Sequence, residues 1–323
     1  MTGYAAHPLY GESMAVLAAV IFAWTSVLFT TAGDRLGVTT VNLLRLPVAT
    51  LCLGLTHVVV TGDLIPAQLG PRETFWIGLS GVVGLAVGDS ALFRAFTLVG
   101  PRRGMMMMAT APVFTAVAAW LLLGERLGPQ ALAGIALVIG GVLLATARRD
   151  PGGGRYRNLA PALLRTGLLL ALVAAAGQGL GSAFAKLGMT GAAAEAAGAA
   201  AAGVARPGVD PLGATLTRMF WASVAYWLFV VPRHRLPSLI APLKDRRGAL
   251  ALAAAILLGP FVSVWISLVA IKHAEAGVAQ VLLGTVPIFV ILPAWLVYRD
   301  RPSPLALAGV GVAVGGGALL FLR

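Results

Sequence analysis

Apolar segments of about 20 residues recur along the whole chain, and each is long enough to cross the ~30 Å hydrocarbon layer of a membrane. Of the 323 residues, 59% are hydrophobic and 11% are charged, whereas a soluble domain carries about 25% charged residues. One soluble core cannot bury this many apolar segments. The sequence therefore predicts an all-α polytopic membrane protein with ten transmembrane helices, at approximately residues 13–31, 39–60, 73–98, 104–123, 128–147, 166–187, 213–231, 249–272, 277–298 and 304–322.

The chain contains two copies of one unit. The segment APVFTAVAAWLLLGERLGPQALAG, which starts at Ala111, aligns without gaps on VPIFVILPAWLVYRDRPSPLALAG, which starts at Val286. In this alignment Pro112 and Pro287 are equivalent and lie 175 positions apart. An ungapped match of this length indicates an internal repeat.

The two copies are predicted to cover residues 13–147 and 166–322, joined by a linker at 148–165. An alanine- and glycine-rich segment at 190–210 interrupts the second copy, and we expect a mobile loop there with some helical tendency. Each copy has five spans, and this odd number turns the second copy upside down relative to the first. Many secondary transporters build two related gates around one central site from such inverted repeats. A duplication that only enlarged a membrane-embedded scaffold is the alternative.

Ionisable residues within the spans are the strongest functional signal. A charged side chain near the middle of a bilayer costs about 2.5 kcal/mol or more and usually has a partner or lines a pathway. Asp89 is the only carboxylate deep in a span; it lies about 15 Å from the end of its helix, so its short side chain cannot reach the interface. Arg45 and Arg218 are equivalent in the two copies and lie nearer to helix ends, which leaves extension to the interface open for both.

Spans two and three run antiparallel, which brings Arg45 to a depth near those of Asp89 and Arg94. We predict that these three side chains form a cluster that faces the protein interior. Its role is either structural charge neutralisation, or proton coupling and binding of a substrate carboxylate. Because the second copy has Val264 and Val269 at the positions of Asp89 and Arg94, any such site is asymmetric.

Other unusual residues within the spans are candidates for a central cavity, since binding cavities are mostly apolar with a few placed polar groups. Pro112 and Pro287 each lack a backbone N–H and are expected to act as paired hinges or cavity-lining bends. Ordinary packing is the alternative at every candidate. The candidates on or near the cavity are Trp24, Met108, Pro112, Gln178, Ser263, Trp265 and Thr285.

Glycines spaced four residues apart lie on one face of a helix and allow a second helix to approach closely. This spacing predicts packing and carries no chemistry. It occurs in the pairs Gly84 and Gly88, Gly177 and Gly181, and Gly311 and Gly315.

The stretch GDSALFRAFTLVGPRRG, followed by APVFTAVAAWLLLGERLGPQALAGIALVIGGV, resembles the third to fifth helices of EamA-like proteins in the drug/metabolite transporter superfamily. GPFVSVWISLVAIKHAEAGVAQVLLGTVPIFVILPAW is similar to the matching region of their second repeat. The resemblance covers residues 13–322 and implies ten helices in two inverted five-helix repeats, a central pathway and no ATP hydrolysis. The chain departs from the family where Arg299 and Asp300 replace the Gly-Glu pair of the first copy. Glu125 and Asp300 are expected to cap the helix that follows each of them.

The leading functional hypothesis is a secondary active transporter, either an exporter or an ion- or proton-coupled permease, for a small metabolite or drug-like molecule. The alternatives are a membrane-embedded enzyme and a scaffold without transport. Four scattered histidines and the single Cys52 give no metal-ligand spacing, so neither a metal nor a cofactor is expected.

The expected partners are the small-molecule substrate, membrane lipid and H⁺ or another coupling ion. The net charge of +12 is ascribed to loop arginines at lipid headgroups rather than to nucleic-acid binding. We expect a monomer or homodimer in the cell membrane. The excess of basic residues on the side opposite the N-terminus predicts termini outside the cell, whereas the family resemblance implies termini inside.

Overall fold

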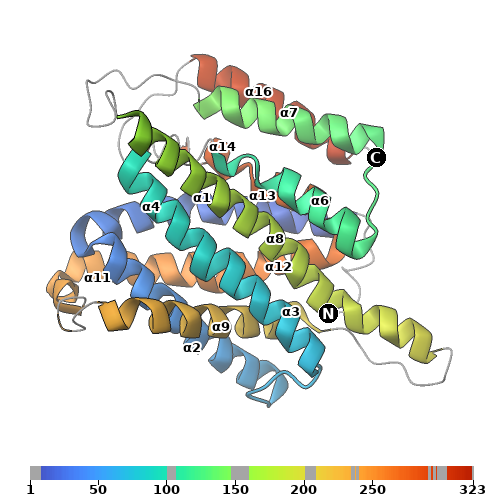
Figure 1. The fold of residues 1–323 in the computed structure, drawn as a ribbon, viewed down its shortest axis with the longest axis horizontal. Helices are drawn as coiled ribbons and strands as arrows, with labels where there is room; N and C mark the ends of the chain where they lie inside the picture. The colour runs from blue at the N-terminus through green and yellow to red at the C-terminus, as the bar shows by residue number, and fades with distance from the viewer. Residues whose placement is uncertain are drawn as a thin grey trace.

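The computed structural model describes residues 9–99, 107–146, 160–200, 209–233, 240–289 and 304–321, with a few single residues between these ranges. Within them the chain is helical almost throughout and forms no β-strand (Figure 1). The first copy contains α1 (Tyr10–Leu36), α2 (Val38–Thr61), α3 (Pro71–Gly81), η2 (Val82–Gly88), α4 (Asp89–Val99), α6 (Ala111–Leu123) and α7 (Pro129–Thr146). The second contains α8 (Pro161–Ala200), α9 (Pro211–Val230), α11 (Arg246–Ile256), η5 (Leu257–Ser263), α12 (Val264–His273), α13 (Ala276–Leu283), α14 (Val286–Phe289) and α16 (Pro304–Phe321), with short 3-10 turns η3 (Val231–Arg233) and η4 (Ala241–Lys244).

Each predicted span coincides with one or more helices, as far as its residues are described. Five helical segments are long and apolar enough to cross a membrane by length and composition, and three further apolar helices are shorter. The protein is therefore a multi-pass helical membrane protein, although the described residues establish fewer complete crossings than the ten predicted. Residues 147–159 and 201–208, which contain most of the linker and part of the alanine-rich segment, lie outside the described ranges.

The alanine-rich segment begins as helix and not as loop. Helix α8 runs for 40 residues to Ala200, and its end projects beyond the rest of the bundle (Figure 1). Alanine has the highest intrinsic helix propensity, so the helix continues through residues that the sequence analysis assigned to a mobile loop.

The third span of each copy is a helix with a π-helical stretch in its middle. The stretches η2 and η5 are seven residues long in both copies and are equivalent at the 175-position separation. A π-helical stretch widens the helix locally and frequently marks a functional site. The stretch η2 ends directly before Asp89, and η5 ends directly before Val264, the residue equivalent to Asp89.

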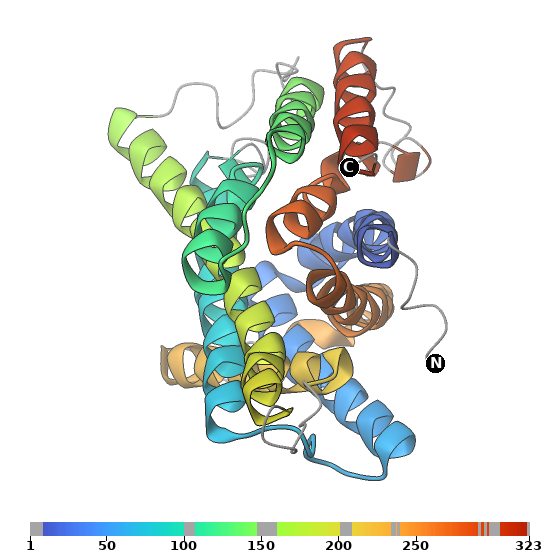
Figure 2. The same ribbon diagram turned by 90° about the vertical axis from the view of Figure 1, so that its right-hand side faces the viewer.

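Contacts between the copies follow an internal two-fold pattern. Helix α1 packs against α11 and α12 of the second copy, and its equivalent α8 packs against α3 and α4 of the first. The equivalent helices α2 and α9 pack on each other, and α6 packs on α13, a helix from the fourth predicted span of the other copy. Helices α7 and α16 form a further pair at one side of the bundle (Figures 1 and 2). The hydroxyls of Thr50 and Ser223, which are repeat partners, lie 3.2 Å apart.

Two of the predicted glycine pairs pack on each other. A Cβ atom at Gly181 would lie 3.1 Å from Cα of Gly84, and one at Gly177 would lie 3.2 Å from Cα of Gly88. These contacts hold α8 against the π-helical stretch η2. The prediction was wrong for the pair Gly311 and Gly315, which face open space, because the α7–α16 contact uses the neighbouring Gly316.

The equivalent prolines of the two copies, Pro112 and Pro287, lie just after a break in the helix. The chain turns at residues 109–110 and again at 284–285, and helix resumes at Ala111 and at Val286. Pro112 thus lies in the first turn of α6, where the missing N–H would have no intrahelical acceptor. Equivalent breaks in the two copies replace the bends that the sequence analysis expected within continuous helices.

Candidate functional site

A cavity of about 320 Å³ lies between the two copies. It is lined by helices of both copies, including the π-helical stretches and the two breaks. Most of its walls are apolar, and its polar groups are few. The lining residues are Phe22, Thr25, Ser26, Phe29, Arg45, Leu46, Leu85, Asp89, Leu92, Met108, Ala109, Ala111, Pro112, Val142, Gln178, Ser182, Arg218, Met219, Pro260, Val264, Ser267, Ile271, Gln280, Leu283, Gly284 and Val286.

Most of this lining consists of repeat partners. The two copies therefore contribute equivalent residues to the cavity, which lies where the copies meet. The partners that both line the cavity are Phe22 and Gln178, Ser26 and Ser182, Arg45 and Arg218, Leu46 and Met219, Leu85 and Pro260, Asp89 and Val264, Leu92 and Ser267, Met108 and Leu283, Ala109 and Gly284, and Ala111 and Val286.

An ion pair joins the second and third spans of the first copy. Nη2 of Arg45 donates to Oδ2 of Asp89, and the two side chains are 12% and 10% exposed. Asp89 is the first residue after η2, so the wide turn sets the direction of its carboxylate. The pairing of Arg45 with Asp89 that the sequence predicted is therefore present.

Arg218 brings a second guanidinium into the same cavity from α9 of the other copy. Its side chain is buried, and its charge interacts with that of Asp89. Glycines make room for it: a Cβ atom at Gly84 would lie 2.9 Å from Nη2 of Arg218, and one at Gly81 would lie 2.1 Å from its backbone oxygen. Oε1 of Gln178 would lie 3.5 Å from the same Gly84 Cβ, so both side chains border Gly84.

A hydrogen bond between two polar lining residues connects α8 and α13 at the cavity. Oγ of Ser182 in α8 donates to Oε1 of Gln280 in α13, at 2.8 Å, and also contacts the carbonyl of Gln178. The Gln280 amide is thereby oriented by a residue of a different helix. Its nitrogen is left to serve a ligand or water in the cavity.

At one end of the bundle a buried ion pair joins the copies. Nζ of Lys186 lies 2.6 Å from Oε1 of Glu125, and the side chains are 12% and 14% exposed. The other carboxylate oxygen, Oε2, accepts from the backbone N–H of Ala276, at 2.9 Å. Glu125 therefore caps α13 of the second copy and not α7, the next helix, as the sequence analysis expected. Asp300 lies outside the described residues.

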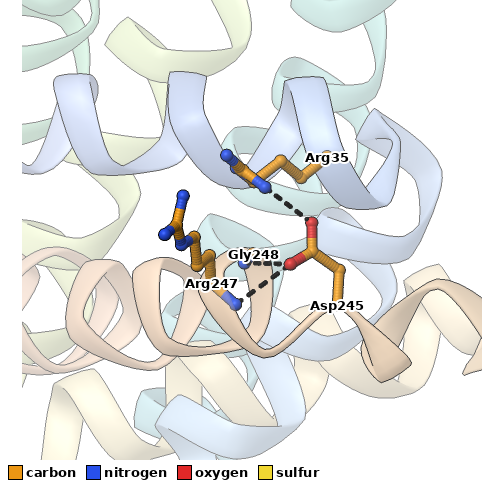
Figure 3. A network of polar contacts seen from close by, with 4 residues as sticks. All are labelled: Arg35, Asp245, Arg247 and Gly248. Atoms are coloured by element: carbon orange, nitrogen blue, oxygen red, sulfur yellow. Dashed lines mark hydrogen bonds and ion pairs between the residues drawn. The ribbon is translucent and has the colours of Figure 1, made fainter.

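A second ion pair joins the copies at the C-terminal end of α1, and this pair is exposed. Nη1 of Arg35 donates to Oδ2 of Asp245 at 2.9 Å, and the side chains are 40% and 36% exposed (Figure 3). Oδ1 of Asp245 accepts from the backbone N–H groups of Arg247 and Gly248 and so caps α11. The hydrogen bond from Arg35 lowers the pKa of Asp245.

Six of the predicted site residues line the cavity, and five do not. Those that line it are Arg45, Asp89, Met108, Pro112, Gln178 and Arg218. Trp24 is 41% exposed on the outside of α1, because Thr25 and Ser26 take the inward positions of that helix turn. Arg94 is exposed too, so the predicted three-residue cluster is wrong in its third member, whose place Arg218 takes.

The other three predicted residues lie one step from the cavity. Ser263 is buried and donates to the carbonyl of Ala18 at 2.8 Å, a contact between helices. Trp265 packs against the buried cluster that contains Leu43, Met219 and Val264. Thr285 lies between two lining residues, but its hydroxyl donates to the carbonyl of Leu282.

Sequence reasoning missed several polar lining residues, notably Ser182, Ser267 and Gln280. Two signals were available for finding them. One is the helical spacing of four residues, which places Ser182 on the face of Gln178. The other is the equivalence of the two copies. Ser267 is equivalent to Leu92, which lies three residues after Asp89 and therefore on the same helix face.

A bundle of long apolar helices around a chamber that holds a few buried charges defines a polytopic membrane protein with an internal cavity. Residues 9–147 and 165–322 each match the EamA-like transporter family. Together these matches cover most of the chain, so the protein belongs to this family of membrane transporters.

A solved structure described only as "Crystal structure of protein" has the same fold. It superimposes with a TM-score of 0.69 at 18% sequence identity and covers 96% of this chain and 97% of its own. This likeness concerns the fold alone. A comparison with curated proteins gave no match.

Proposed function

We propose that the protein is a secondary active transporter that moves a small solute through the cavity between the copies by alternating access. The observation that carries the proposal is the lining of this cavity by repeat partners from both copies. Two equivalent half-sites around one chamber are the arrangement in which a rocking motion exposes the same site to either face of the membrane.

The two ion pairs between the copies support two gates. The Glu125–Lys186 pair and the Arg35–Asp245 pair lie toward opposite ends of α1, since Gly11 at the start of α1 contacts Ala274, which also accepts from Lys186. In the proposal, one pair breaks when the cavity opens to its side. The Glu125–Lys186 pair is the more deeply buried of the two.

Asp89 is the proposed coupling residue. It is buried at the cavity wall, forms an ion pair with Arg45 and interacts with the charge of Arg218 at longer range. Protonation of its carboxylate would release Arg45 and leave both guanidinium groups without a counter-ion, so proton binding and substrate binding would influence each other. Structural charge neutralisation is the competing role.

The lining favours transport over enzymatic chemistry. Among the described lining residues, Asp89 is the single carboxylate, and they include neither histidine nor cysteine. A hydrolytic or transfer reaction needs a nucleophile and a base within hydrogen-bond reach. The same residues are sufficient for binding and release of a solute.

The proposal includes the membrane topology. We infer that ten segments cross the cell membrane as inverted repeats, 13–147 and 166–322, and that the termini lie outside. Cysteine labelling at position 2 and in the linker 148–165, in intact cells and in a Cys52→Ala background, would test this. A protected terminus together with a labelled linker would refute it.

The test of transport is uptake of a radiolabelled metabolite panel by reconstituted protein, with and without a proton gradient. The decisive variant is Asp89→Asn, because Asn is isosteric and can still accept from Arg45. If the Asp89→Asn protein folds but has lost gradient-driven uptake, the result supports coupling at Asp89. Lost expression that a second change at Arg45 rescues supports the structural role. Normal gradient-driven uptake rejects both roles, and an absence of uptake in the unmodified protein rejects transport.

A further inference from the structure

The charged groups of the cavity do not balance. Two guanidinium groups, from Arg45 and Arg218, face one carboxylate, that of Asp89. Arginine stays protonated at neutral pH, so the cluster carries one positive charge in excess. A buried charge without a counter-ion is costly, and buried charges in proteins are normally paired.

Arg218 is the residue that lacks its own counter-ion. In the described part of the chain, the ion pair at this cluster joins Asp89 to Arg45, and no carboxylate lies within 4.0 Å of the Arg218 guanidinium. Its Nε is buried without a hydrogen-bond partner among the described residues. The α9 backbone at Arg218 packs closely on Gly81, and Nη2 of the guanidinium packs on Gly84.

A helix N-terminus adds positive potential on another wall of the cavity. Helix α6, 13 residues long, begins at the lining residues Ala111 and Pro112, and no side chain caps it. The hydroxyl of Thr110, at the cap position, donates backward to the carbonyl of Met107. Broken helices in transporters commonly direct such N-termini at anionic groups of the substrate.

The rest of the cavity limits the anion to a small, largely apolar molecule. Its volume of about 320 Å³ is at the lower end of the ~300–1,000 Å³ of ligand pockets. Phe22, Phe29, Leu46, Leu85 and Met219 form much of the wall. The single excess charge matches a monoanion better than a doubly charged phosphate.

We propose that the cavity binds a small monocarboxylate with an apolar body, and that Arg218 contacts the carboxylate while Arg45 remains with Asp89. The inference names the substrate class of the proposed transporter and rests on that function. A planar guanidinium accepts a carboxylate through two parallel hydrogen bonds. The Gln178 amide and the backbone N–H groups at the start of α6 are further donors among the lining residues.

The test uses pairs of molecules that have one shape and differ in charge: phenylacetate and phenylacetamide, benzoate and benzamide, hexanoate and hexanamide. Binding to the purified full chain in detergent is measured by thermal shift and isothermal titration. We expect the acids to bind and the amides to bind at least tenfold more weakly. Arg218→Gln should lose about 10- to 100-fold in affinity for the acids. The control Arg165→Gln removes an exposed arginine that belongs neither to the cavity lining nor to either proposed gate, and it should bind as the unmodified protein does.

Gly84→Ala provides a second variant in case Arg218→Gln fails to fold. The added methyl group displaces Nη2 of Arg218 but leaves every charge in place, so weaker acid binding at unchanged amide binding supports the inference. Equal binding of acids and amides, acid binding that survives both variants, or no acid that binds would each overturn it. Uptake of neutral solutes without acid binding removes the substrate class and leaves transport standing, while acid binding without uptake of any solute removes transport and leaves the binding site.

Discussion

The third span of the first copy, Pro71–Val99, and that of the second, Arg246–His273, have the same backbone structure. They differ in the residue that each places at the cavity, which is charged in the first copy and apolar in the second. Both consist of a helix, a seven-residue π-helical stretch and a second helix, at equivalent positions. The stretch ends before Asp89 in the first copy and before Val264 in the second, and both residues line the cavity. Duplication thus retained the shape of the chamber, while substitution placed its charge on one wall.

The same wide turn has different local sequences in the two copies. The second has Pro260 within η5, which cannot donate a backbone hydrogen bond. The first has no proline there and instead packs Gly84 and Gly88 on the glycines of α8. In the second copy, the equivalent Gly259 meets Thr25 of α1. Tertiary contact with the first helix of the other copy is what the two turns share.

The largest effect is expected from removing the charge that distinguishes the copies. Asp89→Leu leaves two buried guanidinium groups without an acid and should destabilise the protein by about 3–5 kcal/mol. The double variant Asp89→Leu/Arg45→Leu should recover most of this loss. Val264→Leu, at the equivalent position, adds one methylene toward the cavity and serves as the control. Thermal unfolding and expression level are the measurements, and an Asp89→Leu protein as stable as the control would contradict the comparison.

The next effect separates the two repeat-equivalent arginines. Arg45→Gln removes the direct partner of Asp89 and should cost about 1.5–3 kcal/mol. Arg218→Gln removes the excess charge and should leave stability unchanged or raise it. The same unfolding measurement decides between them; equal losses would mean that the two arginines share the carboxylate evenly.

A smaller effect is expected from the two equivalent glycines of the wide turns. Gly259→Ala places a Cβ 2.6 Å from Cγ2 of Thr25, a β-branched side chain on a helix that cannot rotate away, and should cost about 1–2 kcal/mol. Gly84→Ala meets the flexible end of Arg218 and should cost less. The order of the two melting temperatures tests this, and a reversed order would show that Arg218 is held rigidly.

The smallest effect concerns the start of the two segments, where Asp245 in the second copy is equivalent to Gly70 in the first. Asp245→Gly should lower the melting temperature by no more than about 2 °C, because the ion pair with Arg35 is exposed and glycine is tolerated as a cap. The Arg35 hydrogen bond lowers the pKa of Asp245, so the contribution is present above the ordinary carboxyl pKa and is lost as pH falls through the lowered value. Melting temperatures of both proteins between pH 3 and 7 should therefore converge at the acidic end.

The sequence by itself determined the helical segments, the duplication and the membrane environment. Each of these is local or periodic: length and apolarity define a span, and an ungapped match defines a repeat. The pairing of Arg45 with Asp89 also followed, because adjacent antiparallel spans bring residues of known depth together.

The tertiary structure alone decided which faces meet. It replaced Arg94 by Arg218 at the cavity, turned Trp24 outward and directed Glu125 to α13 of the other copy. In a soluble protein the apolar face of a helix identifies the core, but in a membrane both lipid and protein interior are apolar, so hydrophobic periodicity does not tell one face from the other. Contacts between small residues and hydrogen bonds between distant segments determine which face of each helix points inward. Examples are the contact of Gly84 with Gly181 and the hydrogen bond of Ser263 to Ala18.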